Sequence, residues 1–179
     1  MENNTEETNK ISKKEKLLEE IQKQRKDEKE STGEEKISLV ISYLNKEWYG
    51  INIENVAEII KLVNIVPLPQ ISDYILGIIN LRGEILPVID LRKLFEISIS
   101  PFSKETRILI VKTDDVKIGL VVDGVTEVME IPAAKIDTPL NTLDKIKVQY
   151  IYGEIKIDDR FLAIINLENI IKETILNKK

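Results

Sequence analysis

Isoleucine restricts the folds open to this chain more than any other residue. It occurs 31 times in 179 residues, against three phenylalanines and one tryptophan. Its branched side chain is stiff at χ1 and packs well on a pleated surface, so it favours strands over helices. With 42% hydrophobic residues, the chain can fill a core of ordinary size. We therefore expect a mainly β globular fold.

The residue types that carry most enzyme chemistry are missing. Neither cysteine nor histidine occurs, which excludes disulfides, thiolate nucleophiles, histidine bases and the usual zinc, haem and copper ligand sets. The seven glycines are scattered and form no phosphate-binding loop. The acidic pair Asp158-Asp159 lies between two apolar runs, where a hairpin turn is the simpler interpretation. We expect no enzyme activity, no cofactor and no metal.

Net charge and hydropathy bear on the partners and the compartment. A formal charge of −5 and a pI near 5.1 oppose a nucleic-acid-binding surface. The first residues lack the basic and then apolar pattern of a signal peptide, and no apolar run approaches the length that spans a bilayer. We expect a cytoplasmic protein that binds no nucleic acid and does not insert into a membrane.

The composition divides the chain near residue 35. Residues 1–36 hold nine Lys or Arg and eleven Asp or Glu, with few apolar side chains. Leu17, Leu18 and Ile21 lie at helical spacing, which suggests a transient helix over 10–29, but this stripe is too short to offset the cost of ordering. We predict a charged, disordered extension over 1–35 and a folded domain over 36–179. Docking of the extension on a partner stays open as an alternative.

The most informative segment runs from Gly77 to Leu91. Two runs rich in β-branched residues, 78–81 and 85–91, flank Arg82-Gly83, where glycine can adopt positive φ and reverse the chain. Because side chains alternate along a strand, Arg82 ends the mixed row that starts at Ile78 and faces away from Ile79. The pattern predicts a hairpin with one exposed cation at its turn.

Shorter patterns predict the remaining elements. Apolar runs between turn residues indicate strands, and Asp90 stands where a helix cap is expected. The predicted elements are strands at 37–44, 48–53 and 58–63, a helical turn at 53–57, a loop at Pro67 and Pro69, a short helix at 90–95 and a closing helix at 167–176.

The second part of the chain repeats the first. Gly50 and Glu58 match Gly119 and Glu127 at an offset of 69, and aliphatic residues from Leu86 onward match others at an offset of 76. The glycine and glutamate matches carry most of the weight in so isoleucine-rich a chain. We predict two related halves, approximately 36–100 and 101–179, with a small insertion in the second.

Several segments in this order resemble the signature of the CheW family, the bacterial chemotaxis coupling proteins. They are Gly77 to Leu91, Trp48 to Ile51, Val56 to Ile59 and Gly119 to Val125, and the resemblance covers about residues 36–176. It implies two small five-stranded β-barrel subdomains packed together, with short helices that include a C-terminal one. It also implies a scaffold role in place of catalysis.

The resemblance further implies partners and binding residues. The expected partners are the cytoplasmic tip of a methyl-accepting chemoreceptor and the regulatory domain of a CheA-type histidine kinase, in membrane-associated receptor arrays to which the protein is recruited. Arg82 and Glu58 match the family's charged pair beside the receptor groove, and we expect them to touch. Four more residues match positions that line this groove, although core residues would look identical: Val56, Gly77, Val121 and Val122.

Other functions compete with this one. A CheW-like adaptor in a different chemosensory-type circuit, such as one governing surface motility, fits the same residues. A CheV-type protein would carry a receiver domain after the CheW-like part, and we expect none because the chain has no room for it after Lys179. An enzyme that uses carboxylates would need a compact acidic cluster with raised pKa values.

Overall fold

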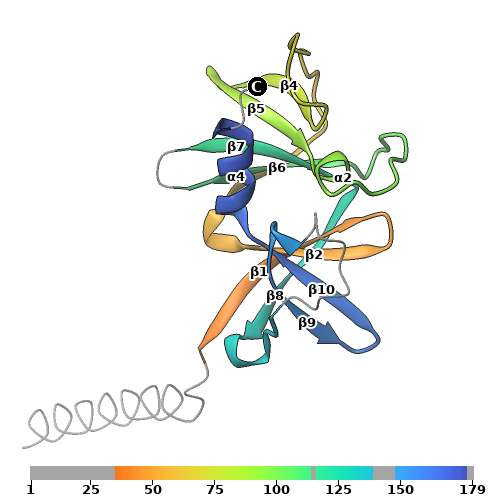
Figure 1. The fold of residues 1–179 in the computed structure, drawn as a ribbon, viewed down its shortest axis with the longest axis vertical. Helices are drawn as coiled ribbons and strands as arrows, with labels where there is room; N and C mark the ends of the chain where they lie inside the picture. The colour runs from red at the N-terminus through yellow and green to blue at the C-terminus, as the bar shows by residue number, and fades with distance from the viewer. Residues whose placement is uncertain (1–34, 114–115, 139–147, 177–179) are drawn as a thin grey trace, which may run out of the picture. The chain divides into compact units, whose positions relative to one another are not determined.

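The computed structural model describes residues 35–113, 116–138 and 148–176. Within these ranges the chain is mainly β, with two five-stranded sheets and a few short helices, as the sequence predicts (Figure 1). No described helix is long and apolar enough to cross a membrane. The predicted extension over 1–35, with its helix over 10–29, lies outside the described residues except for Glu35.

Sheet A combines strands from the beginning and the end of the domain. Its strand order is β8-β1-β2-β10-β9, and all neighbours are antiparallel except β2 and β10. The bounds are β1 Lys36–Leu44, β2 Glu47–Asn52, β8 Gly124–Pro132, β9 Ile151–Ile157 and β10 Arg160–Ile165.

Sheet B has the same design. Its order is β3-β6-β7-β5-β4, with one parallel pair, β5 and β7. The bounds are β3 Val56–Lys61, β4 Ile75–Leu81, β5 Glu84–Asp90, β6 Arg107–Lys112 and β7 Lys117–Val122.

The two sheets correspond strand by strand. Taken in order across the sheet, the strands of sheet A correspond to those of sheet B as follows: β8 to β3, β1 to β6, β2 to β7, β10 to β5 and β9 to β4. This agrees with the internal repeat seen in the sequence. Each sheet takes strands from both predicted halves, 36–100 and 101–179, so those halves remain a division of the sequence and do not each carry one sheet.

Each sheet curls until its two edges approach. In sheet B, Val66 follows edge strand β3 and forms an isolated bridge with Ile78 of the opposite edge strand β4. In sheet A, Asp137 and Glu154 of β9 form the corresponding bridge. A glycine precedes each bridged strand residue, and an added Cβ on Gly77 would overlap the backbone of Val66. These close approaches make each sheet barrel-like.

The short helices follow strands β5 and β10. Helix α2 (Leu91–Leu94) is capped by Asp90, whose carboxylate accepts a hydrogen bond from the Arg92 backbone. Helix α4 (Leu167–Leu176) closes the described chain, and Asn166 accepts from the backbone of the residue three positions later. Both predicted helices are confirmed. A 3₁₀ turn, η1 (Ile53–Asn55), leads into β3, which begins two residues before the predicted start of that strand.

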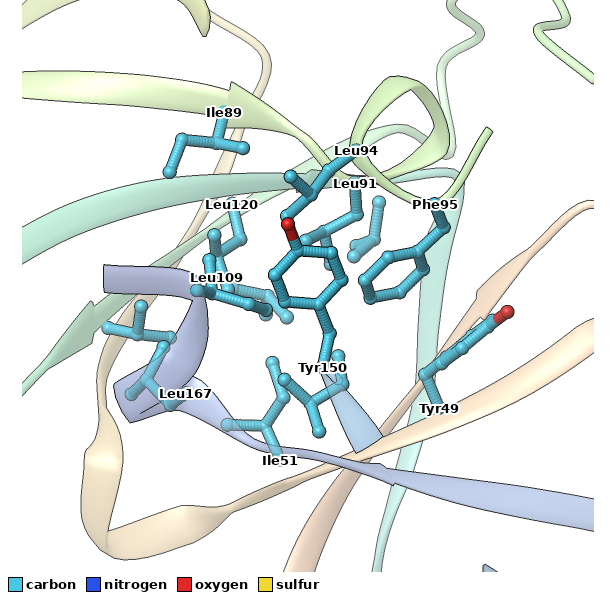
Figure 2. Packing of buried hydrophobic residues seen from close by; sticks show 14 of the residues in the cluster. Tyr49, Ile51, Ile89, Leu91, Leu94, Phe95, Leu109, Leu120, Tyr150 and Leu167 are labelled. Carbon is cyan, nitrogen blue, oxygen red and sulfur yellow. The ribbon is translucent and has the colours of Figure 1, made fainter. Parts of the chain in front are cut away.

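A shared hydrophobic cluster joins the two sheets. Phe95 stacks on Tyr150 with a ring-centroid distance of 5.8 Å and lies 5.3 Å from Tyr49. Figure 2 shows these rings beside aliphatic side chains from both sheets and from α4. Each sheet also has one smaller hydrophobic cluster of its own in its interior. Because the central cluster draws on both sheets, its burial holds the two together.

Candidate functional site

The turn between β4 and β5 places one arginine at a hairpin tip. Arg82 and Gly83 both have positive φ, of 54° and 89°, as a two-residue hairpin loop with the correct twist requires. The side chain of Asn80 accepts a hydrogen bond of 2.9 Å from the backbone of Gly83. Arginine is uncommon in this conformation, and the surrounding ladder holds it there. The turn therefore places the Arg82 side chain at the hairpin tip.

Arg82 forms an ion pair with Glu58 of β3. Its Nη2 donates to Oε1 of Glu58 over 2.8 Å, which confirms the contact predicted from the sequence. The Arg82 side chain is 77% exposed, whereas that of Glu58 is 30% exposed. An exposed pair of this kind contributes only about 0–1 kcal/mol to stability. The pair consequently orients the guanidinium more than it stabilises the fold.

Large apolar side chains are exposed along β3 and the segment after it. Ile59, Val63, Val66 and Leu68 are each between 40% and 51% exposed. Sequence analysis did not identify them as surface residues, because an apolar run beside two prolines is equally compatible with a buried strand end. We call these four residues the β3 patch. Large apolar side chains exposed along one short segment make that segment a candidate protein-binding surface.

The other predicted groove residues lie deeper. Val56 is half-buried against the central cluster, and Gly77 is buried at the bridge to Val66. Val121 and Val122 are fully buried, the first inside sheet B and the second in the central cluster. Their predicted part in a receptor groove remains a prediction; in the free chain they lie beneath the surface and would shape a groove from below.

The equivalent tip of sheet A has different chemistry. Its turn, Asp158-Asp159, is a hairpin turn as predicted, and Asp158 shares the positive φ of Arg82, at 52°. At the offsets of the repeat, Asp158 corresponds to Arg82, and Glu127 corresponds to Glu58. Two acids cannot form the ion pair that Arg82 makes. The oriented cation is thus a property of the sheet B tip alone among these two equivalent turns.

The neighbouring pair differs between the sheets as well. In sheet B, Lys117 of β7 forms an ion pair with Glu84 of β5. In sheet A, the equivalent positions hold Trp48 and Arg160, and the guanidinium lies 4.7 Å from the indole centroid. The two barrel ends therefore offer different surfaces on the same backbone design.

Metal chemistry has no support in the described residues. No group of three or more Asp or Glu side chains in the described ranges is arranged to hold a metal ion. Every buried side-chain nitrogen and oxygen there has a hydrogen-bond partner. The described residues offer an exposed ion pair and exposed apolar side chains on and after β3, which are groups suited to binding a protein.

Comparison with known proteins gives one consistent family. The model of the CheW-like domain matches residues 38–174. The chemotaxis protein CheW of Helicobacter pylori is 33% identical over 145 residues, which cover 81% of this chain and 87% of that protein. The crystal structure of the scaffolding protein TtCheW from Thermoanaerobacter tengcongensis superposes with a TM-score of 0.68 at 41% identity, covering 74% of this chain and 86% of that one.

A match over a shorter part of the chain carries another name. Protein PilI of Pseudomonas aeruginosa is 31% identical over 98 residues, or 55% of each chain.

Proposed function

We propose that this chain, which belongs to the CheW-like domain family, is a chemotaxis adaptor. It would couple chemoreceptors to a CheA-type histidine kinase. The observation that carries the proposal is the exposed Arg82–Glu58 ion pair, whose glutamate lies on β3, the strand that also carries the exposed side chain of Ile59. A scaffold needs binding surfaces and no catalytic group, which fits a chain without histidine or cysteine.

The receptor would bind at the sheet B tip. A receptor tip is helical, and an amphipathic helix binds by laying its apolar stripe in a groove lined with aliphatic side chains. The β3 patch supplies such side chains, and Arg82 supplies a charge that fixes the register of the helix. Val56, Gly77, Val121 and Val122 would set the shape of this surface from beneath.

The kinase would bind elsewhere on the same domain. A standard interface uses roughly 800 Å² on each partner, about a tenth of the surface of a small protein, so two partners fit at once. The kinase regulatory domain, which resembles the CheW-like family, can meet a barrel end of this chain. Simultaneous binding would place the protein in the cytoplasm at membrane-associated receptor arrays.

A second circuit is supported by one specific match. Protein PilI carries a name other than CheW, and it aligns with this chain over 98 residues. An adaptor for a chemosensory-type kinase that governs surface motility would use the same geometry. The identity of the kinase that co-purifies with the protein separates these two functions.

Co-sedimentation with receptor-containing membranes tests the proposed binding site. We expect the wild-type chain to pellet with such membranes and Arg82→Ala to stay in the supernatant. Lys36→Ala is the matched control, because Lys36 is also an exposed cation, in a loose 3.9 Å pair with Glu130 of sheet A. Equal pelleting of Arg82→Ala and wild type would place receptor binding away from the sheet B tip.

A further inference from the structure

A buried ion-pair network lies where the chain passes between the sheets. Arg92 of α2 is 1% exposed, and its Nε and Nη2 donate to the two oxygens of Asp90 over 2.9 and 2.7 Å. Its Nη1 donates to Asp123 over 3.0 Å and to the carbonyl of Ser100 over 2.8 Å. The guanidinium also lies 4.9 Å from the ring centroid of Phe102.

Asp123 links this network to sheet A. It is the single residue between β7 of sheet B and β8 of sheet A. Its second carboxylate oxygen accepts a hydrogen bond of 2.7 Å from the backbone of Asn45, in the turn between β1 and β2. The side chain of Asn45 in turn donates to the carbonyl of Ser98, in the segment after α2. We call Asp90, Arg92, Asp123 and Asn45 the clasp.

The repeated fold does not require the clasp. At the equivalent positions of the other repeat stand Asn166 for Asp90, Glu168 for Arg92 and Glu54 for Asp123. Asn166 still caps its helix, and its backbone donates to Tyr150 just as that of Asp90 donates to Tyr74. Glu168 is exposed and pairs only loosely with Lys172. One strand-and-helix unit therefore forms without a buried ion pair.

The energetics indicate that the clasp serves to orient parts of the fold more than to stabilise it. Burying charges carries a large desolvation cost, and apolar replacements of similar volume are often as stable or more so. A guanidinium that bonds two carboxylates has fixed directions, because its planar fork matches their geometry. Hydrogen bonding to Asp90 raises the pKa of Arg92 against the opposing effect of burial, so the cation persists. The directional hydrogen bonds of the clasp can therefore fix the relative orientation of the two sheets. The apolar cluster cannot do so, because hydrophobic contacts are non-directional.

We propose that the clasp is a positioning device that fixes the orientation of sheet A relative to sheet B. Its residues touch the β1–β2 turn, the β7–β8 crossover and α2, which are the elements that a rotation between the sheets would displace. This deepens the proposed function, on which its signalling consequence rests: for a kinase bound to sheet A, a receptor at the sheet B tip would act through the relative orientation of the two sheets.

Distance measurements between spin labels test the orientation without any partner. The chain has no native cysteine, so labels can be placed at exposed Lys112 of β6 and Glu130 of β8, one on each sheet. We expect one narrow distance peak in the otherwise wild-type chain and loss of that narrow peak in Asp123→Asn. Glu54→Gln, the matched substitution at the other crossover, should leave it narrow. A second label pair within sheet A, at Glu130 and Lys156, should stay narrow in every variant.

A second variant guards against a folding failure in Asp123→Asn. Asn45→Gly removes the contact with Ser98 and suits the turn, because Asn45 already has a φ of 55°. Asn45→Gly should also broaden the distance peak between the labels at Lys112 and Glu130. The proposal is overturned if both variants keep the narrow peak, or if the pair within sheet A broadens equally, since that indicates general loosening.

Signalling provides an independent readout. Clasp variants should bind receptor-containing membranes and the kinase as well as wild type does. Receptor control of kinase activity should fall by about tenfold, which is within the usual range of coupling between two sites. Full control with a broadened peak would overturn the coupling role and leave the structural role standing. If wild type itself gives no kinase control, the proposed function fails. The spin-label distances between the sheets would still test whether the clasp fixes their orientation.

Discussion

Arg82 donates a 2.8 Å hydrogen bond to Glu58 from a turn 24 residues further along the chain. The contact forms because sheet B curls until the β4–β5 hairpin meets edge strand β3, the same closure that brings Val66 to Ile78. The pair therefore lies at a barrel end, where the side chain of Arg82 is mostly exposed on a turn with positive φ.

Removing the pair should affect binding far more than stability. Arg82→Ala should shift the free energy of unfolding by no more than about 1 kcal/mol, because the guanidinium is mostly exposed. Urea denaturation followed by circular dichroism measures this. The swapped variant, Arg82→Glu with Glu58→Arg, should fold equally well. A loss well beyond this value in Arg82→Ala would make the residue structural.

Gly77→Ala should be strongly destabilising. Gly77 has a φ of 141°, and an added Cβ would overlap the carbonyl of Val66 in the bridge that closes sheet B. We expect a cost of about 2 kcal/mol or more, typical of a strained backbone combined with a steric clash. Gly83→Asn is the control, since Gly83 has open space around it and asparagine tolerates positive φ. Similar melting temperatures for the two variants would contradict the close approach.

Asp90→Ala should cost more stability than Asp123→Asn. Asp90 receives two of the Arg92 side-chain hydrogen bonds and also caps α2, so its loss leaves a buried guanidinium with one carboxylate partner. Breaking a buried pair in this way costs roughly 3–5 kcal/mol. Asp123→Asn keeps the bidentate pair and an oxygen acceptor. Chemical denaturation of both variants gives the order, and the reverse order would contradict the assignment.

Stability should fall at alkaline pH through two buried tyrosines. Burial raises the pKa of Tyr150 from 10.0 to about 12, and burial and the hydrogen bond to Glu47 raise the pKa of Tyr49 further. The folded state therefore favours the neutral phenols, and this contribution is complete below pH 10 and is lost as pH rises through the folded pKa values. Tyr150→Phe should reduce the decline of the urea midpoint above pH 10. An unchanged slope would indicate that Tyr150 titrates normally when folded.

Local rules predicted the fold well where they apply directly. Glycine at Gly83 and paired acids at Asp158-Asp159 both indicated hairpin turns, and Asp90 indicated a helix start. These features depend on a few adjacent residues. The repeat also indicated duplicated strands, because glycine and glutamate recurred at a constant offset.

Long-range features were not predictable in the same way. Nothing in a strand's own residues states that β2 pairs in parallel with β10, or that each sheet takes strands from both halves. Arg92 and Asp123 are 31 residues apart in the sequence, and only the fold brings them together. Exposure of Ile59 and its neighbours depends on which strand forms the edge, which alternation alone does not reveal.

Kinase autophosphorylation in receptor-containing membranes shows whether this protein couples receptor to kinase through Arg82. The rate is measured without the protein, with wild type, with Arg82→Ala and with the control Lys36→Ala. We expect strong activation by wild type and by Lys36→Ala, and loss of activation in Arg82→Ala even though that variant is folded. Activation by Arg82→Ala equal to wild type would contradict the assignment of the receptor site, and no activation by wild type with matched partners would contradict the coupling function.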